Sequence, residues 1–161
     1  MKKLLIGIIS VLVILLVAIN LIPEAEDLYE NAPHFNYEDL MDHTSDHSFI
    51  YVYGPNCHFC EQIHPVMNTF YKDYGKQTNL QLINVEWQAQ DGSTPNEAIK
   101  ASDNLTEAGD TLTKYSDLLI GGTPSLIEVE DNKVLKVYIG ADQVPEFTKE
   151  YASNHDKDPK E

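Results

Sequence analysis

The chain has two cysteines, Cys57 and Cys60, in the stretch Tyr-Gly-Pro-Asn-Cys-His-Phe-Cys. Two cysteines placed at random in a chain of this length show that spacing only about once in eighty cases. On the first turn of a helix, residues i and i+3 share one face, close enough for a disulfide. The helix dipole and the unpaired N–H groups at that end stabilise a thiolate on the first of them. The spacing therefore predicts a redox pair, with Cys57 the exposed nucleophile and Cys60 the shielded resolving thiol.

Two other interpretations of the pair stay open. A protein outside the cytoplasm can keep a structural disulfide, although a bridge closing so short a loop constrains the unfolded chain little. A metal site would need His58 or His64 beside the two sulfurs. Tetrahedral zinc normally takes a second paired ligand set, and the sequence has none at finger spacing. We therefore expect redox chemistry without a metal or a cofactor.

His58 lies between the cysteines. As a cation near the Cys57 sulfur, its imidazole would stabilise the thiolate and make the oxidised form more reactive. As a solvent-exposed turn residue it would have no role. Both interpretations remain at this point, and His64 is expected to cover helix surface.

The first 23 residues differ from the rest of the chain. Lys2 and Lys3 precede Leu4–Ile22, an apolar run of 19 residues that would span about 28 Å as a helix, close to the thickness of a bilayer's hydrocarbon core. The lysines favour a cytoplasmic N-terminus and an exported C-terminal domain. A cleaved signal peptide, the alternative, has a shorter apolar region of about 7–15 residues that ends at small residues, whereas this run ends at Pro23. We expect a single transmembrane anchor in the cell membrane; either interpretation exports the domain.

The charge of the chain excludes some partners. There are 26 acidic residues against 11 lysines, no arginine, and a formal net charge of −15. Such a surface repels phosphate backbones, so we expect no nucleic-acid binding.

Strand-like and helix-like runs alternate after the leader. We expect a linker over 24–35, one domain over 36–153 with a polar insertion at 88–111, and a disordered tail over 154–161. The predicted elements are a short helix from Asn36, a strand over Ser48–Tyr53, a helix over 57–74 kinked at Pro65, a strand over Leu80–Glu86, a short helix within the insertion, strands over Ser125–Glu130 and Val134–Ile139, and a helix over 142–153. A helix between two strands implies a parallel crossover and the closing hairpin adds antiparallel strands, so the prediction is a mixed sheet with helices on both faces.

The strand, the Gly-Pro-Asn-Cys-His-Phe-Cys stretch, and a helix with a proline eight residues after Cys57 together resemble the thioredoxin family. Gly121-Gly122-Thr123-Pro124-Ser125, just before a strand, is similar to the family's cis-proline loop. The resemblance implies a thioredoxin-like α/β fold in which Pro124 is cis and faces the cysteines. It also implies that the backbone of Thr123 binds an extended substrate peptide.

Three positions depart from the family's reducing cytoplasmic enzymes. Asn56 stands where thioredoxin has a tryptophan, Tyr51 stands at the position of its buried acid, and Leu82 at that of the acid's lysine partner. These departures put in doubt the usual route by which a buried acid takes the proton of the second cysteine. Glu86 is a candidate substitute.

These observations predict an extracytoplasmic thiol–disulfide oxidoreductase that exchanges disulfides with protein substrates, in the oxidising direction, and is recycled by an unidentified redox partner. Export and a single anchor also resemble the surface thioredoxin-like proteins of Gram-positive bacteria, including accessory proteins for disulfide-bearing bacteriocins. The alternatives are a reductase supplied by a membrane electron carrier and a redox-inert adaptor that keeps only the fold.

Overall fold

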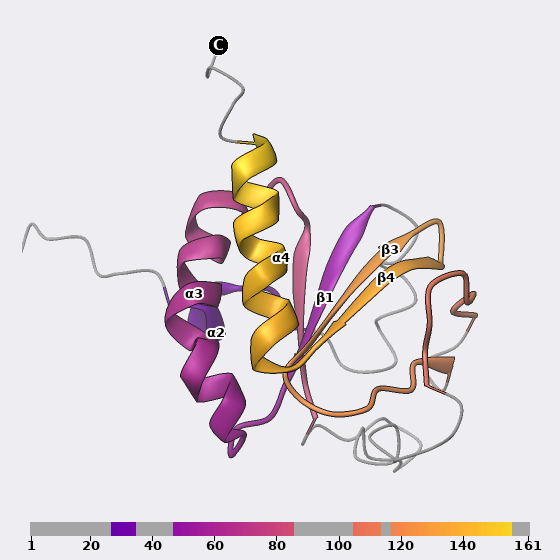
Figure 1. Cartoon of the computed structure of the whole chain (residues 1–161), viewed down its shortest axis with the longest axis horizontal. Helices are drawn as coiled ribbons and strands as arrows, with labels where there is room; N and C mark the ends of the chain where they lie inside the picture. Colours follow the sequence, from indigo (N-terminus) through magenta and orange to yellow (C-terminus); the bar gives the residue numbers. More distant parts are fainter. Residues whose placement is uncertain (1–26, 35–46, 86–104, 114–116, 156–161) are drawn as a thin grey trace, which may run out of the picture.

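The computed structural model describes residues 27–34, 47–85, 105–113 and 117–155 (Figure 1). The anchor prediction, the helix from Asn36 and most of the insertion lie outside these ranges. Within the ranges, no helix is long and apolar enough to cross a membrane.

Four strands form one mixed sheet in the order β2-β1-β3-β4. They are β1 (Ser48–Tyr53), β2 (Leu80–Asn84), β3 (Ser125–Glu130) and β4 (Lys133–Ile139). β1 pairs with β2 in parallel, and β3 is antiparallel to both β1 and β4. The predicted strands and their mixed pairing are confirmed. The strands form at these positions because short β-branched and aromatic runs bounded by turn residues favour buried strands.

Two helices, α3 (His58–Tyr74) and α4 (Gly140–His155), pack side by side on one face of the sheet (Figure 1). Phe49, Tyr51 and Tyr53 point to this face from alternate positions of β1, as the two-residue period of a strand requires. Phe147 of α4 fills the space between the helices and the sheet, with its ring 5.1 Å from that of Phe49 and 5.7 Å from that of Phe70.

Two details of these helices differ from the prediction. Cys57 lies just before α3 as its N-cap, and the helix continues through Pro65. α4 begins at Gly140 instead of Asp142, so Pro145 lies beyond its first turn, and it ends at His155 instead of Ser153. The first two residues of the expected tail are therefore helical.

On the second face of the sheet, the described residues contribute no α-helix, so the expected helix on that face stays a prediction. Ile50, Val52 and Ile127 point to this face, and the described residues that cover them include Leu112, Leu118 and Ile120, from residues 105–113 and 117–120. The segment follows β4 over residues 109–112, where Val134 exchanges backbone hydrogen bonds of 2.8 Å with Gly109 and Asp110. Residues 105–111 were expected to belong to a polar insertion on the rim; within them Thr106 is buried and Thr111 pairs with Lys133 at the edge of the sheet.

Residues 27–34, expected to belong to a linker, fold against the domain. They form α2 (Leu28–Asn31), whose Leu28 and following Ala32 are buried. The Leu28 N–H donates to Asn68 Oδ1 of α3 at 2.7 Å, and the Pro33 carbonyl accepts from the Leu82 N–H of β2 at 2.8 Å. The linker prediction was wrong for this stretch because one helical turn is too short to show periodicity in a sequence.

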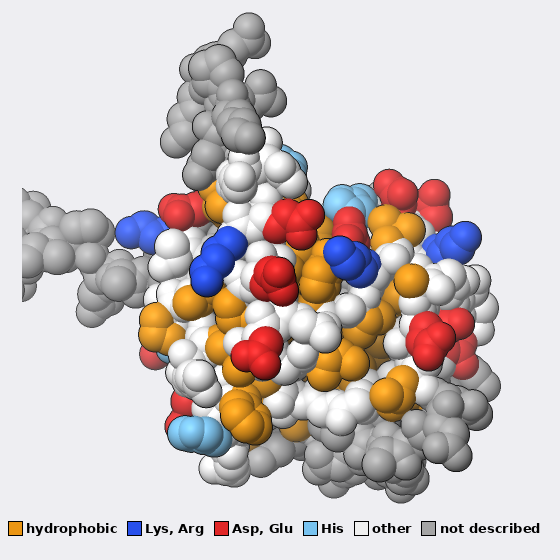
Figure 2. Space-filling model, in the orientation of Figure 1, with side chains coloured by type: hydrophobic (Ala, Val, Ile, Leu, Met, Phe, Trp, Pro, Cys, Tyr) orange, Lys and Arg blue, Asp and Glu red, His pale blue; other side chains and the backbone are white. Residues whose placement is uncertain are grey.

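Figure 2 shows acidic side chains spread over the face that carries α3 and α4, with fewer lysines between them. They do not gather into one patch on this face. The distribution agrees with an acidic surface that keeps the protein in solution.

Candidate redox site

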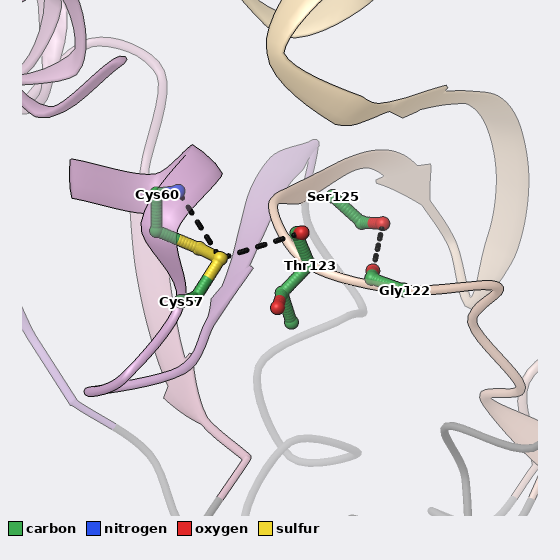
Figure 3. The surroundings of a disulfide bond; sticks show 5 residues. All are labelled: Cys57, Cys60, Gly122, Thr123 and Ser125. Carbon is green, nitrogen blue, oxygen red and sulfur yellow. Dashed lines mark hydrogen bonds between the residues drawn. A yellow bond between two sulfur atoms is a disulfide. The ribbon is translucent and has the colours of Figure 1, made fainter. Parts of the chain in front are cut away.

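Cys57 and Cys60 form a disulfide at the N-terminus of α3, with their Cα atoms 5.2 Å apart (Figure 3). This separation is within the usual range for a disulfide. The pairing follows from the local fold, because N-cap and third helical residue lie on one side of the first turn.

The turn between β1 and α3 places the Cys57 sulfur at the helix end. The Cys57 N–H donates to the Gly54 carbonyl at 3.1 Å, and the Cys57 backbone is extended, as an N-cap requires. The Cys60 N–H then donates to the Cys57 sulfur at 3.1 Å. A sulfur in this position interacts with the positive end of the helix dipole, so a thiolate formed there would be stabilised.

The two sulfurs differ in accessibility. Cys60 is only 2% exposed and belongs to the core between α3 and the sheet, whereas Cys57 is half-buried. The difference has the direction expected for an attacking Cys57 and a shielded Cys60; these chemical roles stay predictions.

The loop before β3 lies against Cys57 (Figure 3). The Thr123–Pro124 peptide bond is cis, as the resemblance implied. The Thr123 carbonyl oxygen is 3.4 Å from the Cys57 sulfur. In the disulfide this sulfur carries no hydrogen, so the contact is a close approach of two atoms; in the dithiol form the Cys57 thiol can donate to the carbonyl. The Ser125 hydroxyl donates to the Gly122 carbonyl at 2.7 Å and holds the loop in place.

Phe59 and His58 are both exposed on the first turn of α3, Phe59 by 56%. The ring of His58 lies 5.8 Å from that of Phe59. The predicted influence of His58 on Cys57 stays a prediction. His64, one turn beyond Cys60, lies with its Nε2 3.2 Å from Asp27 Oδ2 of the segment preceding α2. Across the described ranges, no three histidine, cysteine or carboxylate side chains converge as a metal site would need.

A group of stacked aromatic rings lies in the part of the core that contains Cys60, and local sequence patterns predict only part of it. The ring of Tyr29 stacks on Tyr53 at 4.4 Å and on His64 at 4.5 Å, and Tyr51 stacks on Tyr53 at 6.1 Å. His34 Nε2 lies 3.0 Å from the Tyr53 hydroxyl. Alternation in β1 predicts that Tyr51 and Tyr53 share a face, but nothing in the sequence predicts that Tyr29 joins them.

Burial raises the pKa of Tyr51 far above its ordinary value, and the neighbouring Tyr29 adds to the effect. Burial also raises the pKa values of Tyr29 and Tyr53. Tyr51 faces Leu82 across the β1–β2 ladder, so the two positions that depart from the family pattern are neighbours here. A neutral hydroxyl therefore stands where the resemblance would have placed a carboxylate. Glu86 lies outside the described residues.

The sheet order, the helix that carries the cysteine pair at its start and the cis-proline loop beside it define a thioredoxin-like fold. Chlamydomonas reinhardtii thioredoxin f2 has the same fold, with a TM-score of 0.53, 11% sequence identity, and an alignment covering 81% of this chain and 100% of that one. Mitochondrial thioredoxin 3 from Saccharomyces cerevisiae, in its oxidised form, aligns with a TM-score of 0.48 and 15% identity over 78% of this chain and 97% of that one. No protein-family model and no curated protein sequence matches the chain. At these identities the likeness establishes the fold, and the activity has to be argued from the site.

Proposed function

We propose that this protein is a thiol–disulfide oxidoreductase that acts on protein substrates through Cys57 and Cys60. The observation that carries the proposal is the asymmetry of the disulfide. Cys57 is half-buried at a helix N-terminus, where its sulfur accepts a hydrogen bond from the Cys60 N–H, and it is joined to the buried Cys60. A disulfide kept only for stability gains little from closing so short a loop, and it needs no exposed sulfur.

In the oxidising direction, a substrate thiolate attacks the Cys57 sulfur, and the bonding electron pair leaves on Cys60. A second substrate thiolate then attacks the substrate sulfur of the mixed disulfide, which forms the substrate disulfide and releases the Cys57 thiolate. In the reducing direction, the Cys57 thiolate attacks a substrate disulfide and Cys60 resolves the intermediate. The exposure of Cys57 and the burial of Cys60 suit both directions.

We propose the oxidising direction as the physiological one. The neutral Tyr51 at the position of the family's buried acid supports it, because no carboxylate at that position would take the proton of Cys60. The reduction potential decides: a value near −120 mV would support an oxidase, and one near about −270 mV would indicate a reductase.

We also propose that Leu4–Ile22 anchors the protein in the cell membrane with the redox domain outside the cytoplasm, as in the surface thioredoxin-like proteins of Gram-positive bacteria. The support is the length of the apolar run and the lysines before it. Extraction of membranes with alkaline carbonate tests the anchor, because a protein released by that treatment would not be membrane-spanning. Protease treatment of intact cells tests the side of the membrane.

The function is tested by the oxidative refolding of a reduced protein that contains several cysteines. The full-length protein in detergent micelles should accelerate disulfide formation, and Cys57→Ala should abolish the acceleration. His47→Ala, at an exposed position on the opposite end of β1, is the control and should retain the wild-type rate. The domain is a redox-inert adaptor if the wild-type protein and Cys57→Ala are equally inactive in two assays, the oxidative refolding of a reduced substrate and the reduction of a substrate disulfide.

A further inference from the structure

Two buried hydroxyl groups, on Tyr29 and Tyr51, lie behind the redox pair without a hydrogen-bond partner among the described residues. The side chain of Tyr51 is 0% exposed. A buried hydroxyl without a partner costs free energy, and it is uncommon in folded proteins. The pair therefore calls for a physical explanation.

The side chains of Tyr29 and Tyr51 are neighbours, and both pack in or against the core cluster to which Cys60 belongs. Tyr51 points from β1 toward α3 and belongs to the same buried cluster as Cys60. Tyr29 stacks on His64, which is one helical turn after Cys60. The neighbouring Tyr29 contributes to the raised pKa of Tyr51, after burial, so the two side chains act on each other.

The rest of the buried cluster around Cys60 is apolar apart from tyrosine hydroxyls. Its nearest members along α3 are Ile63 and Met67, and Leu28 covers it from α2. Tyr51, a buried member of this cluster, and Tyr29, which packs against it, carry hydroxyl donors on the same side of the sheet as Cys60.

The oxidation state of Cys60 changes what its sulfur can offer as a hydrogen-bond acceptor. A disulfide sulfur is uncharged and a weak acceptor. Reduction converts the Cys60 sulfur into a thiol or a thiolate and frees the side chain to turn about its Cα–Cβ bond. A thiolate is a strong acceptor, and hydrogen bonds to charged groups are worth more than neutral ones.

We propose that Tyr51, together with Tyr29, is a positioning residue whose hydroxyl binds the Cys60 sulfur in the reduced protein and so raises the reduction potential of the Cys57–Cys60 pair. An interaction that exists only in the reduced state stabilises that state and makes the disulfide a stronger oxidant. The inference deepens the proposed function, on which it rests for its biological meaning, because it assigns the oxidising direction to a particular side chain.

The proposal is tested by equilibrating the full-length protein with glutathione. In this reaction two glutathione thiols are oxidised to glutathione disulfide, while the Cys57–Cys60 disulfide takes up two electrons and two protons. Tyr51→Phe removes only the hydroxyl. We expect it to favour the disulfide about tenfold, equivalent to a potential about 30 mV more negative.

Tyr53→Phe is the matched control. Tyr53 belongs to the same stack and the same face of β1, but its hydroxyl already has His34 Nε2 as a partner at 3.0 Å. Removal of this hydroxyl should leave the reduction potential within about 5 mV of the wild-type value. For comparison, a tenfold change in the equilibrium constant with glutathione corresponds to about 30 mV. If Tyr51→Phe does not fold, Tyr29→Phe takes its place, and its potential should move in the same direction.

An unchanged potential in a folded Tyr51→Phe protein would overturn the proposal and leave the two hydroxyls as a purely structural cost. A shift of equal size in Tyr53→Phe would overturn it as well, because the effect would then belong to the stack as a whole. The proposed function fails separately: a wild-type protein that catalyses no exchange would refute it, whatever the Tyr51→Phe potential.

Discussion

The Cys57 sulfur lies 3.4 Å from the Thr123 carbonyl oxygen, although 66 residues separate them in the chain. The contact arises because β1 and β3 are antiparallel neighbours, with Val52 opposite Ser125. The loop after β1 and the loop before β3 therefore meet at one end of the sheet, where the cysteine pair lies (Figure 3).

The first prediction concerns the intermediate. In Cys60→Ser the buried resolving thiol is gone, so a disulfide-bonded substrate attacked by Cys57 should remain attached as a mixed disulfide. Non-reducing electrophoresis followed by mass spectrometry would detect the adduct. Cys57→Ser is the control and should trap nothing. Adducts of equal abundance in the two variants would mean that Cys60 is as reactive as Cys57, against the burial of its sulfur.

The second prediction concerns the docking of α2. Leu28 is fully buried between α2 and the core, so Leu28→Ala should lower the free energy of unfolding by about 3 kcal/mol. Glu30→Ala, at a more exposed position of the same turn, should change it by less than about 0.5 kcal/mol. Urea denaturation measures both. Equal losses in the two variants would show that α2 contributes through helix formation instead of burial.

The third prediction concerns the segment over the second face of the sheet. The buried Thr106 hydroxyl accepts a hydrogen bond from the Leu119 N–H at 2.7 Å and donates one to the Asp117 carbonyl at 3.2 Å. Thr106→Val keeps the shape of the side chain but leaves the N–H without an acceptor, at a cost of about 1–3 kcal/mol. Thr106→Ser keeps the hydroxyl and should lose much less.

Hydrogen exchange at the Leu119 amide reads this effect directly. The amide should exchange faster in Thr106→Val than in Thr106→Ser. Similar protection in both variants would mean that the segment is held by the packing of Leu112 and Leu118 alone.

The fourth prediction concerns alkaline pH. Burial raises the pKa of Tyr51 above its ordinary value of 10.0. Above about pH 10 the unfolded chain releases this proton and the folded protein keeps it, so the unfolded state binds fewer protons and stability falls as pH rises. Tyr51 alone should contribute a slope of about 1.4 kcal/mol per pH unit in this range.

Urea denaturation between about pH 9 and 11 measures the slope, and Tyr51→Phe should reduce it by about that amount. The wild-type protein and Tyr51→Phe are also compared near neutral pH as a reference. At that pH Tyr51 of the wild-type protein is protonated in both the folded and the unfolded state, so it contributes no slope. A slope that Tyr51→Phe leaves unchanged would contradict the assignment.

The elements around the redox pair were predictable because they depend on residues close together in the chain. The Cys57–Cys60 pairing needs only the first turn of a helix, and β1 and β3 need only short apolar runs with turn residues at their ends. The sequence predicts that β2 ends at Glu86, two residues beyond its observed end at Asn84. The difference arises because strand ends are set by pairing with neighbouring strands.

The sequence by itself determined the pairing of the two cysteines and the strands of the mixed sheet, since both depend on patterns within short stretches of the chain. Only the tertiary structure decided that α2 docks on α3, that Leu112, Leu118 and Ile120 cover the second face, and that Tyr29 is a neighbour of Tyr51. These arrangements join segments far apart in the chain. Which segments come together depends on the shape and polarity of the surfaces that remain exposed once the rest of the domain has folded. A local sequence pattern holds no information about those surfaces.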